Sequence, residues 1–192
     1  MTLLILGLIV FLGAHSVHMF APRWRERMIA RIGLMPWKGL YSVASIIGLV
    51  LIIVGFGMAR QAPTLLYVPP LWLKHLNALF TLVAFVLIAA AYVPRNRLKA
   101  KIGHPMLAGV KLWAIGHLLA TGFVHDVVLF GAFLAWAVVD FAVSRRRDRT
   151  TGTVYPAGTL AGDAVAVVLG VVAWAIFALL LHAPLIGVNP FA

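Results

Sequence analysis

Apolar residues fill six long segments of the chain, and prolines, glycines or basic residues bound each of them. The segments cover residues 3–20, 37–59, 71–93, 105–122, 124–143 and 161–182. A helix needs about 20 apolar residues to cross the hydrocarbon core of a bilayer, and each segment is close to that length. The pattern therefore predicts an all-α bundle of six transmembrane helices, which forms a single membrane domain over residues 1–192.

Basic residues gather in the first, third and fifth connecting segments, whereas the second and fourth are nearly free of charge. The basic segments contain Arg23, Arg25, Arg27, Arg31 and Lys38, then Arg95, Arg97, Lys99 and Lys101, and finally Arg145, Arg146, Arg147 and Arg149. Loops rich in lysine and arginine stay in the cytoplasm, so both termini are expected on the outer face. The net charge of +11 then reflects topology and attraction to anionic lipids, and it does not indicate nucleic-acid binding.

The composition agrees with a membrane protein, because 63% of the residues are hydrophobic and 11% are charged. Such a chain cannot cover a soluble globule with polar groups. No cysteine is present, which excludes disulfides, thiolate metal sites and thiol catalysis. The first apolar segment contains His15 and His18 and has no basic residues before it, so we interpret it as a retained span and not as a signal peptide.

The first basic segment has the pattern of an interfacial helix. Trp24, Met28 and Ile32 share one face of a helix over residues 22–32, and arginines occupy another. An apolar face opposite a basic one favours a helix that lies flat at the membrane surface. A well-anchored loop is the alternative.

Two histidines lie inside apolar segments, His15 in the first and His117 in the fourth. An ionisable side chain in hydrocarbon is costly, so it usually has a partner or a function. His18 and Met19 share the helical surface of His15. A hydrogen bond from each histidine to a backbone carbonyl or a hydroxyl is the simpler alternative.

The chemistry of these histidines favours haem over a bare metal ion. A zinc site usually has three or four ligands, and no carboxylate lies near His15 in the sequence. Haem needs only one or two axial ligands and apolar walls, for which Phe11 and Trp113 are candidates. His15 and His117 are expected on opposite sides of the bilayer midplane. His75 is therefore a reserve ligand that would pair with His117 and leave His15 and His18 for another haem or for structure.

Other polar residues of the apolar segments have plainer interpretations. His104 precedes Pro105 and is expected to cap the fourth helix. Lys111 either extends back toward the cytoplasmic headgroups or donates to an anionic group inside the bundle. Asp140 is expected to pair with Arg145 and Arg146. Two further expectations are that Asp126 orients His125 and that Asp163 lies in the first turn of the last helix.

Two stretches, GAHSVHMF and HPMLAGVKLWAIGHLLATG, resemble the NnrU family of bacterial membrane proteins, which is similar to the zeta-carotene isomerases. The spacing of His104, Trp113 and His117 is the most specific part of this likeness. The resemblance implies a b-type haem inside the bundle with His15 and His117 as axial ligands. It also implies an inner-membrane location and a link to denitrification and nitric oxide metabolism. The isomerases have an alternative cysteine ligand, and Ala114 occupies that position here.

Three hypotheses follow. The first is a haem-b membrane protein that senses gas or redox state, transfers electrons or isomerises a lipophilic substrate, so an isomerase or oxidoreductase activity stays open. Its partners would be the lipid bilayer, haem, and nitric oxide or a lipophilic small molecule. The second is a cofactor-free assembly or regulatory factor for nitric oxide reductase. The third is a small transporter in which Lys111 and the histidines mark an ion path, although no inverted repeat is visible.

Overall fold

The computed structural model describes residues 1–191, and six helical passes account for most of them. The passes are α1 (Thr2–Phe20), α3 (Leu34–Ala59), α4 (Trp72–Tyr92), α6 (Pro105–Ala120), α7 (Val124–Thr151) and α8 (Leu160–Ala175), and a π-helical stretch, Ile176–Leu181, extends α8. Three short helices complete the described chain, namely α2 (Pro22–Ile32), α5 (Arg97–Ile102) and α9 (His182–Ile186). The all-α fold class predicted from the sequence is confirmed.

Five of these passes are long and apolar enough to cross a membrane. The sixth, α6, is apolar but has 16 residues, which corresponds to about 24 Å at 1.5 Å per residue. Helix α7 is the longest, with 28 residues, and it continues for two turns beyond the apolar segment predicted to end at residue 143. Large apolar side chains are exposed along α3, α8 and the π-helical stretch that extends α8, for example Ile46, Ile53, Val168 and Leu179, as expected for surfaces that face lipid.

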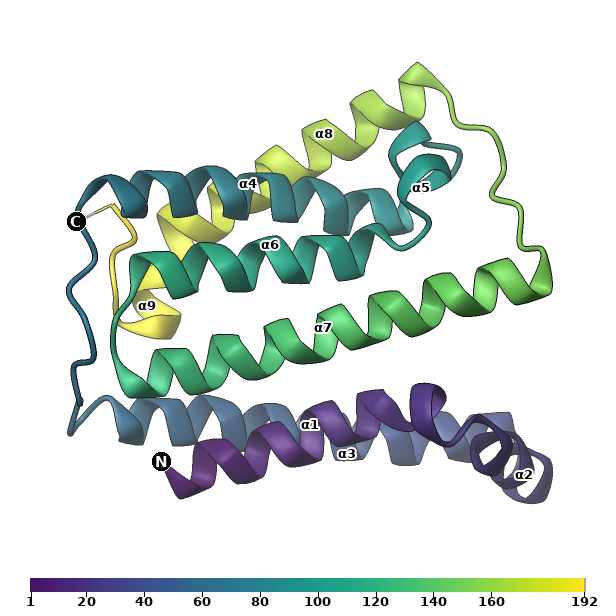
Figure 1. Ribbon diagram of the computed structural model, residues 1–192, viewed down its shortest axis with the longest axis horizontal. Coiled ribbons are helices and arrows are strands. Elements are labelled where there is room, and N and C mark those ends of the chain that lie inside the picture. The colour runs from purple at the N-terminus through teal and green to yellow at the C-terminus, as the bar shows by residue number, and fades with distance from the viewer. Residues whose placement is uncertain (192) are drawn as a thin grey trace.

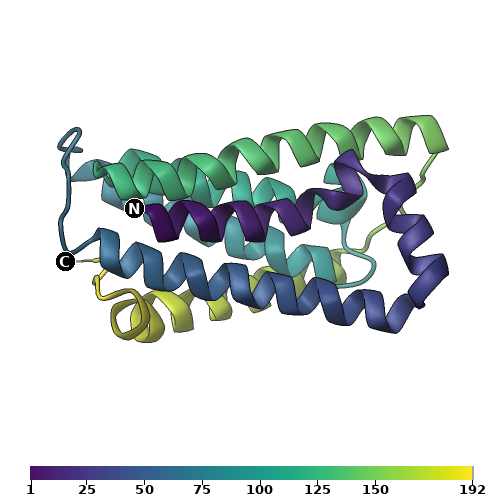
Figure 2. The same cartoon turned by 90° about the horizontal axis from the view of Figure 1, so that it is seen from below.

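The helices pack as an open row in the order α3, α1, α7, α6, α4, α8. Figure 1 shows α7 between α6 and the α1–α3 pair, and Figure 2 shows α3 and α8 set to the same side of the row. Helix α1 packs closely on α3, as α4 does on α6, whereas α1 packs more loosely on α7. The molecule thus consists of two tight helix groups joined through α7.

Glycines permit the close packing of α1 on α3. A Cβ atom added at Gly48 would lie 2.7 Å from the backbone nitrogen of Phe11, and one at Gly55 would lie 2.3 Å from that of Leu4. Neither distance is possible for real atoms, so only glycine allows the two backbones to approach this closely.

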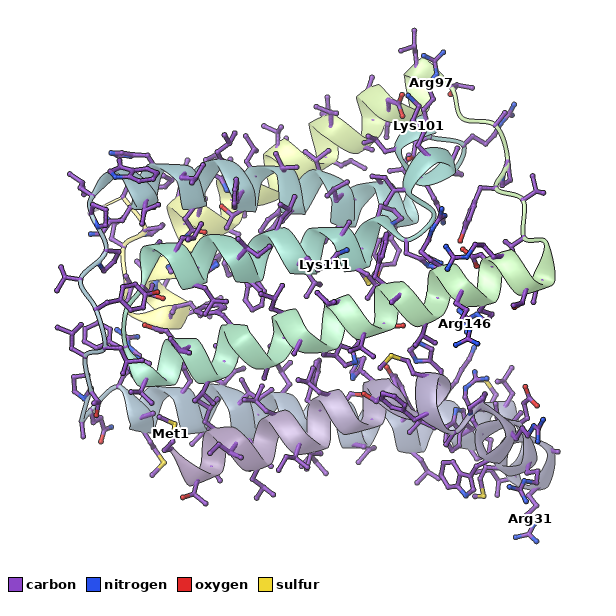
Figure 3. All side chains as sticks on the ribbon, in the orientation of Figure 1. Met1, Arg31, Arg97, Lys101, Lys111 and Arg146 are labelled. Atoms are coloured by element: carbon purple, nitrogen blue, oxygen red, sulfur yellow. The ribbon has the colours of Figure 1, made fainter. Side chains whose placement is uncertain are left out.

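The basic segments lie together at one end of the bundle. Helices α2 and α5 and the last turns of α7 are at this end, and the two ends of the described chain lie at the other (Figure 1). Figure 3 shows Arg31, Arg97, Lys101 and Arg146 at the basic end and Met1 at the opposite end. This arrangement agrees with the alternation of charge in the sequence. Which end faces the cytoplasm stays a prediction.

Residues next to two short helices at the basic end explain why each helix begins where it does. Pro22 begins α2, a helix that forms over the predicted residues, and Trp24 packs edge-on against Trp37 with ring centroids 5.6 Å apart. Helix α5 was not predicted. It begins at Asn96, whose buried side chain accepts a hydrogen bond from the backbone nitrogen of Lys99 and donates to the carbonyls of Ala90 and Val93.

Candidate functional site

His15 and His117 have the same local hydrogen bonding. Nδ1 of His15 lies 2.7 Å from the carbonyl oxygen of Phe11, and Nδ1 of His117 lies 2.8 Å from that of Trp113. A carbonyl oxygen only accepts, so Nδ1 donates in both rings and Nε2 carries the lone pair of a neutral imidazole. No hydrogen bond within residues 1–191 involves Nε2 of either ring. Each histidine therefore makes a hydrogen bond to a backbone carbonyl through Nδ1, which was the simpler explanation for a histidine in an apolar segment. The Nε2 atom of each ring is left for a ligand.

Aromatic rings connect the two histidines. Phe11 stacks on His15 with centroids 4.2 Å apart, and Trp113 lies 5.4 Å from His117. Both Phe11 and Trp113 contact Phe133 of α7, at 5.8 and 5.5 Å. We call these five residues, His15, Phe11, Phe133, Trp113 and His117, the aromatic cluster. The structure thus gathers the two predicted ligands and the two predicted wall residues around one side chain of the central helix.

The two imidazoles lie at different levels along α7. His117 stacks on Phe130 with centroids 4.4 Å apart, whereas His15 packs edge-on against Trp136 at 6.1 Å. Phe130 and Trp136 are six residues apart, so the two levels differ by about 9 Å along the helix. This is the offset in depth that the sequence led us to expect, and the rings of Phe11, Phe133 and Trp113 lie between the histidines.

The sequence analysis missed the part of the site that α7 contributes. Phe130, Phe133 and Trp136 recur at three-residue intervals, a spacing that places them on neighbouring turns of one helix face. This interval was the available signal. Because a stripe of aromatic residues is equally typical of a plain helix core, the spacing alone would not have identified a site.

His18 lies outside the aromatic cluster and pairs with Asp140. Nε2 of His18 lies 3.0 Å from Oδ1 of Asp140, which also accepts a hydrogen bond of 3.0 Å from Ser144. Asp140 is 4% exposed. The prediction that Asp140 pairs with Arg145 and Arg146 is wrong. The side chain of Asp140 lies on the face of α7 that packs on α1, where His18 and Ser144 are its partners.

His75 and His125 lie outside the aromatic cluster. His75 is exposed in the first turn of α4, and no ring contact within residues 1–191 includes it. His125 is buried at the start of α7, with Nε2 3.6 Å from Oδ1 of Asp126. The structure therefore places the predicted pair His125 and Asp126 together and keeps His75 at the surface.

His104 is the N-cap residue of α6, as expected, but its side chain makes no capping hydrogen bond. Its Nε2 instead lies 2.8 Å from Oδ2 of Asp148, which also accepts a 2.8 Å hydrogen bond from Tyr155. Burial and the hydrogen bond to Asp148 raise the pKa of Tyr155 to about 12. Burial opposes ionisation of Asp148, but the hydrogen bonds from Tyr155 and His104 outweigh it and lower the pKa of Asp148.

An open apolar groove of about 490 Å³ lies between α1 and α7. Leu12, Ser16, Trp136 and Val139 are among the residues that line it. The indole nitrogen of Trp136 is buried without a hydrogen-bond partner. Within residues 1–191 no group of three or more histidine, aspartate or glutamate side chains is placed to hold a metal ion.

The family model of the NnrU protein matches residues 3–190. The match covers nearly the whole chain, which therefore belongs to the NnrU family. No curated protein and no solved structure matches it.

Proposed function

We propose that this member of the NnrU family binds haem b in the bacterial inner membrane, with His15 or His117 as the iron ligand. The free Nε2 atoms of the two neutral imidazoles carry the proposal, because neutral imidazole nitrogen is a common haem ligand. The backbone carbonyls that accept from Nδ1 fix the orientation of each ring, as outer partners of metal ligands commonly do. Haem would supply gas binding or electron transfer at its iron.

The surroundings fit haem in chemistry, but the spacing limits how iron is held. Aromatic walls on three helices suit a flat macrocycle. Two imidazole nitrogens on one metal ion, at about 2 Å each, lie about 4 Å apart, and the offset of about 9 Å along α7 does not fit a single iron bound by both rings in this packing. The described conformation supports one histidine ligand per iron. Ligation by both would require α1 to move along α7, the loosest interface of the row.

Absorption spectroscopy tests the proposal directly. We expect the protein, purified in mild detergent and supplemented with haem, to show a Soret band that shifts on reduction. His117→Ala and His15→Ala separately remove each ligand, and the exposed His75→Ala serves as the matched control. Loss of the band in a ligand variant but not in the control supports the assignment. Absence of any Soret band from the supplemented wild-type protein would overturn it.

The number of ligands is a second readout of the same samples. With one histidine on the iron we expect a five-coordinate, high-spin spectrum, and only one of the two alanine variants should lose haem. A six-coordinate, low-spin spectrum, lost in both variants, would show that α1 and α7 repack when haem binds.

A cofactor-free assembly or regulatory factor for nitric oxide reductase is the second candidate. The continuous ring packing from His15 to His117 favours it, because that packing is already complete without a macrocycle. Co-purification with a reductase, with no porphyrin bound to this chain, would support this candidate. The link to denitrification and nitric oxide rests on the family and belongs to both candidates.

We further propose that the basic end of the bundle faces the cytoplasm. The chain has no cysteine, so single cysteines report sidedness without a background. An impermeant maleimide added to intact cells stripped of their outer membrane should label Asn189→Cys and should label Thr150→Cys only after the membrane is opened. The reverse pattern would invert the topology.

A further inference from the structure

The apolar groove between α1 and α7 runs along both helices. Its lining extends from Ile5 to Phe20 on α1 and from Val128 to Val139 on α7. The α7 stretch rises about 16 Å, which is close to half of the hydrocarbon core, about 15 Å. Large side chains at the edges of the groove are exposed, with Ile9 at 65% and Phe20 at 71%. The groove therefore has the length of one acyl chain in one leaflet of a bilayer.

Small residues give the groove its depth. Gly13, Ala132 and Ala135 are part of the lining, and a Cβ atom added at Gly13 would meet nothing within 4 Å. The polar groups of the lining are not available to a ligand. The hydroxyl of Ser16 donates to a backbone carbonyl, and the indole nitrogen of Trp136 is buried. Such a surface suits a hydrocarbon chain.

The face of α7 that lines the groove continues to an arginine at the basic end. Val128, Ala135 and Val139 are separated by seven and four residues, a spacing that keeps them on one helix face. Arg146 follows Val139 by seven residues, so it lies on the same face about 10 Å further along the helix. Arg146 is exposed, and Figure 3 shows its side chain extending from the end of α7 toward α2.

The α1 side of the groove leads to further cations. Phe20 is the last residue of α1, and Arg23 and Arg27 follow it in α2, where both are exposed. Helix α2 contains four arginines and one acidic residue, Glu26. The three ion pairs of residues 1–191 all involve histidine, so no arginine of the described chain is paired with a carboxylate. Arginine suits phosphate because its N–H groups match phosphate oxygens in pairs.

We propose that the groove binds one acyl chain of an anionic phospholipid, in the leaflet at the basic end of the bundle. The headgroup lies against Arg146 and Arg23, and the second chain stays in the bilayer. The positive charge at the end of the groove complements the phosphate and the net charge of such a lipid. The lipid fills the loosest interface of the row and couples α1 to α7. This inference is independent of the proposed haem site.

Native mass spectrometry of the full chain in detergent tests the headgroup. The dissociation constant of the first bound lipid is measured for phosphatidylglycerol, which is anionic, and for phosphatidylcholine with the same acyl chains. We expect the wild-type protein to prefer phosphatidylglycerol by at least about fivefold. Arg146→Gln should reduce this preference about fivefold, whereas Lys101→Gln, an exposed control at the same end of the bundle, should leave it unchanged.

A second set of variants tests the groove itself. Gly13→Phe places a ring where the acyl chain would lie, and it should abolish the tight first site for both lipids. Gly57→Phe is the matched control, because a Cβ atom at Gly57 also meets nothing within 4 Å, and it should keep the site. Ala135→Phe fills the groove from α7 and should give the same loss if Gly13→Phe does not fold.

Four results would overturn the inference. Equal affinities of the wild-type protein for the two lipids would exclude an anionic headgroup. An unchanged preference in Arg146→Gln would place the headgroup elsewhere. An unchanged first site in the groove-filling variants would show that the acyl chain lies outside the groove. If the same spectra show a wild-type dimer that the groove-filling variants disrupt, the groove is an interface between copies of the chain and the lipid assignment is wrong.

Discussion

The pair of His18 and Asp140 is a polar connection between α1 and α7, and removing it should loosen the central interface. Asp140 accepts one hydrogen bond from His18 and one from Ser144, each 3.0 Å long. Polar contacts between membrane helices contribute about 0.6 kcal/mol on average and up to about 1.7. The side chain of His18 is 36% exposed, so screening reduces its share. We therefore expect Asp140→Ala to cost about 1–3 kcal/mol, with about 1 kcal/mol due to His18.

A double-mutant cycle in mixed micelles measures this coupling. The free energy of unfolding by sodium dodecyl sulfate is determined for the wild-type protein, His18→Ala, Asp140→Ala and the double variant, with Ser144→Ala to isolate the second hydrogen bond. The coupling between His18 and Asp140 should exceed about 0.5 kcal/mol, which is the limit of additivity for independent sites. If the two single changes add within that limit, the pair does not hold α1 on α7 and the argument is refuted.

Two further predictions concern packing and pH. Gly55→Leu should lower the free energy of unfolding by about 1–3 kcal/mol, because the new side chain would overlap with α1. The control is Gly57→Leu, which should change the stability little because a Cβ atom at Gly57 meets nothing within 4 Å. Equal losses of stability in the two variants would refute the packing argument. The lowered pKa of Asp148 means that its ionised form stabilises the fold above the ordinary carboxyl pKa of about 4, and that this contribution is lost as the pH falls through the lower folded-state value. Tyr155→Phe should therefore destabilise the protein at pH 7, and its deficit relative to the wild-type protein should shrink as acid protonates Asp148, whose pKa is lowered. A deficit independent of pH would contradict the assignment.

The number and order of the passes could be predicted from the sequence, because the length of an apolar segment and the charges beside it can be read from the residues themselves. The helix boundaries at the basic end of the bundle could not be predicted in this way. Helix α7 continues through the arginine-rich run to Gly152, which ends it in the left-handed conformation with φ of 66°, and α5 depends on hydrogen bonds from the buried Asn96. A run of basic residues is compatible with both loop and helix, so tertiary contacts decide between them.

The ring beside each histidine of the aromatic cluster was predictable from the sequence, but the residue at the centre of the cluster was not. His15 follows Phe11 by four residues and His117 follows Trp113 by four, so helical periodicity alone places each ring beside its histidine. The convergence of both pairs on Phe133 depends on which helix lies between α1 and α6, and no local pattern encodes that neighbour. The partner of Asp140 was missed for the same reason.

The row of helices also constrains the order in which the protein assembles. Neighbours along the chain, α1 with α3 and α4 with α6, form the tight hairpins, so each can pair as soon as it leaves the translocation machinery. Helix α7 is synthesised fifth among the passes but occupies an inner place in the row, between the two finished hairpins (Figure 1). Until α7 has been made, the surfaces of α1 and α6 that pack on it lack that partner, so the two hairpins can join into one row only after α7 inserts.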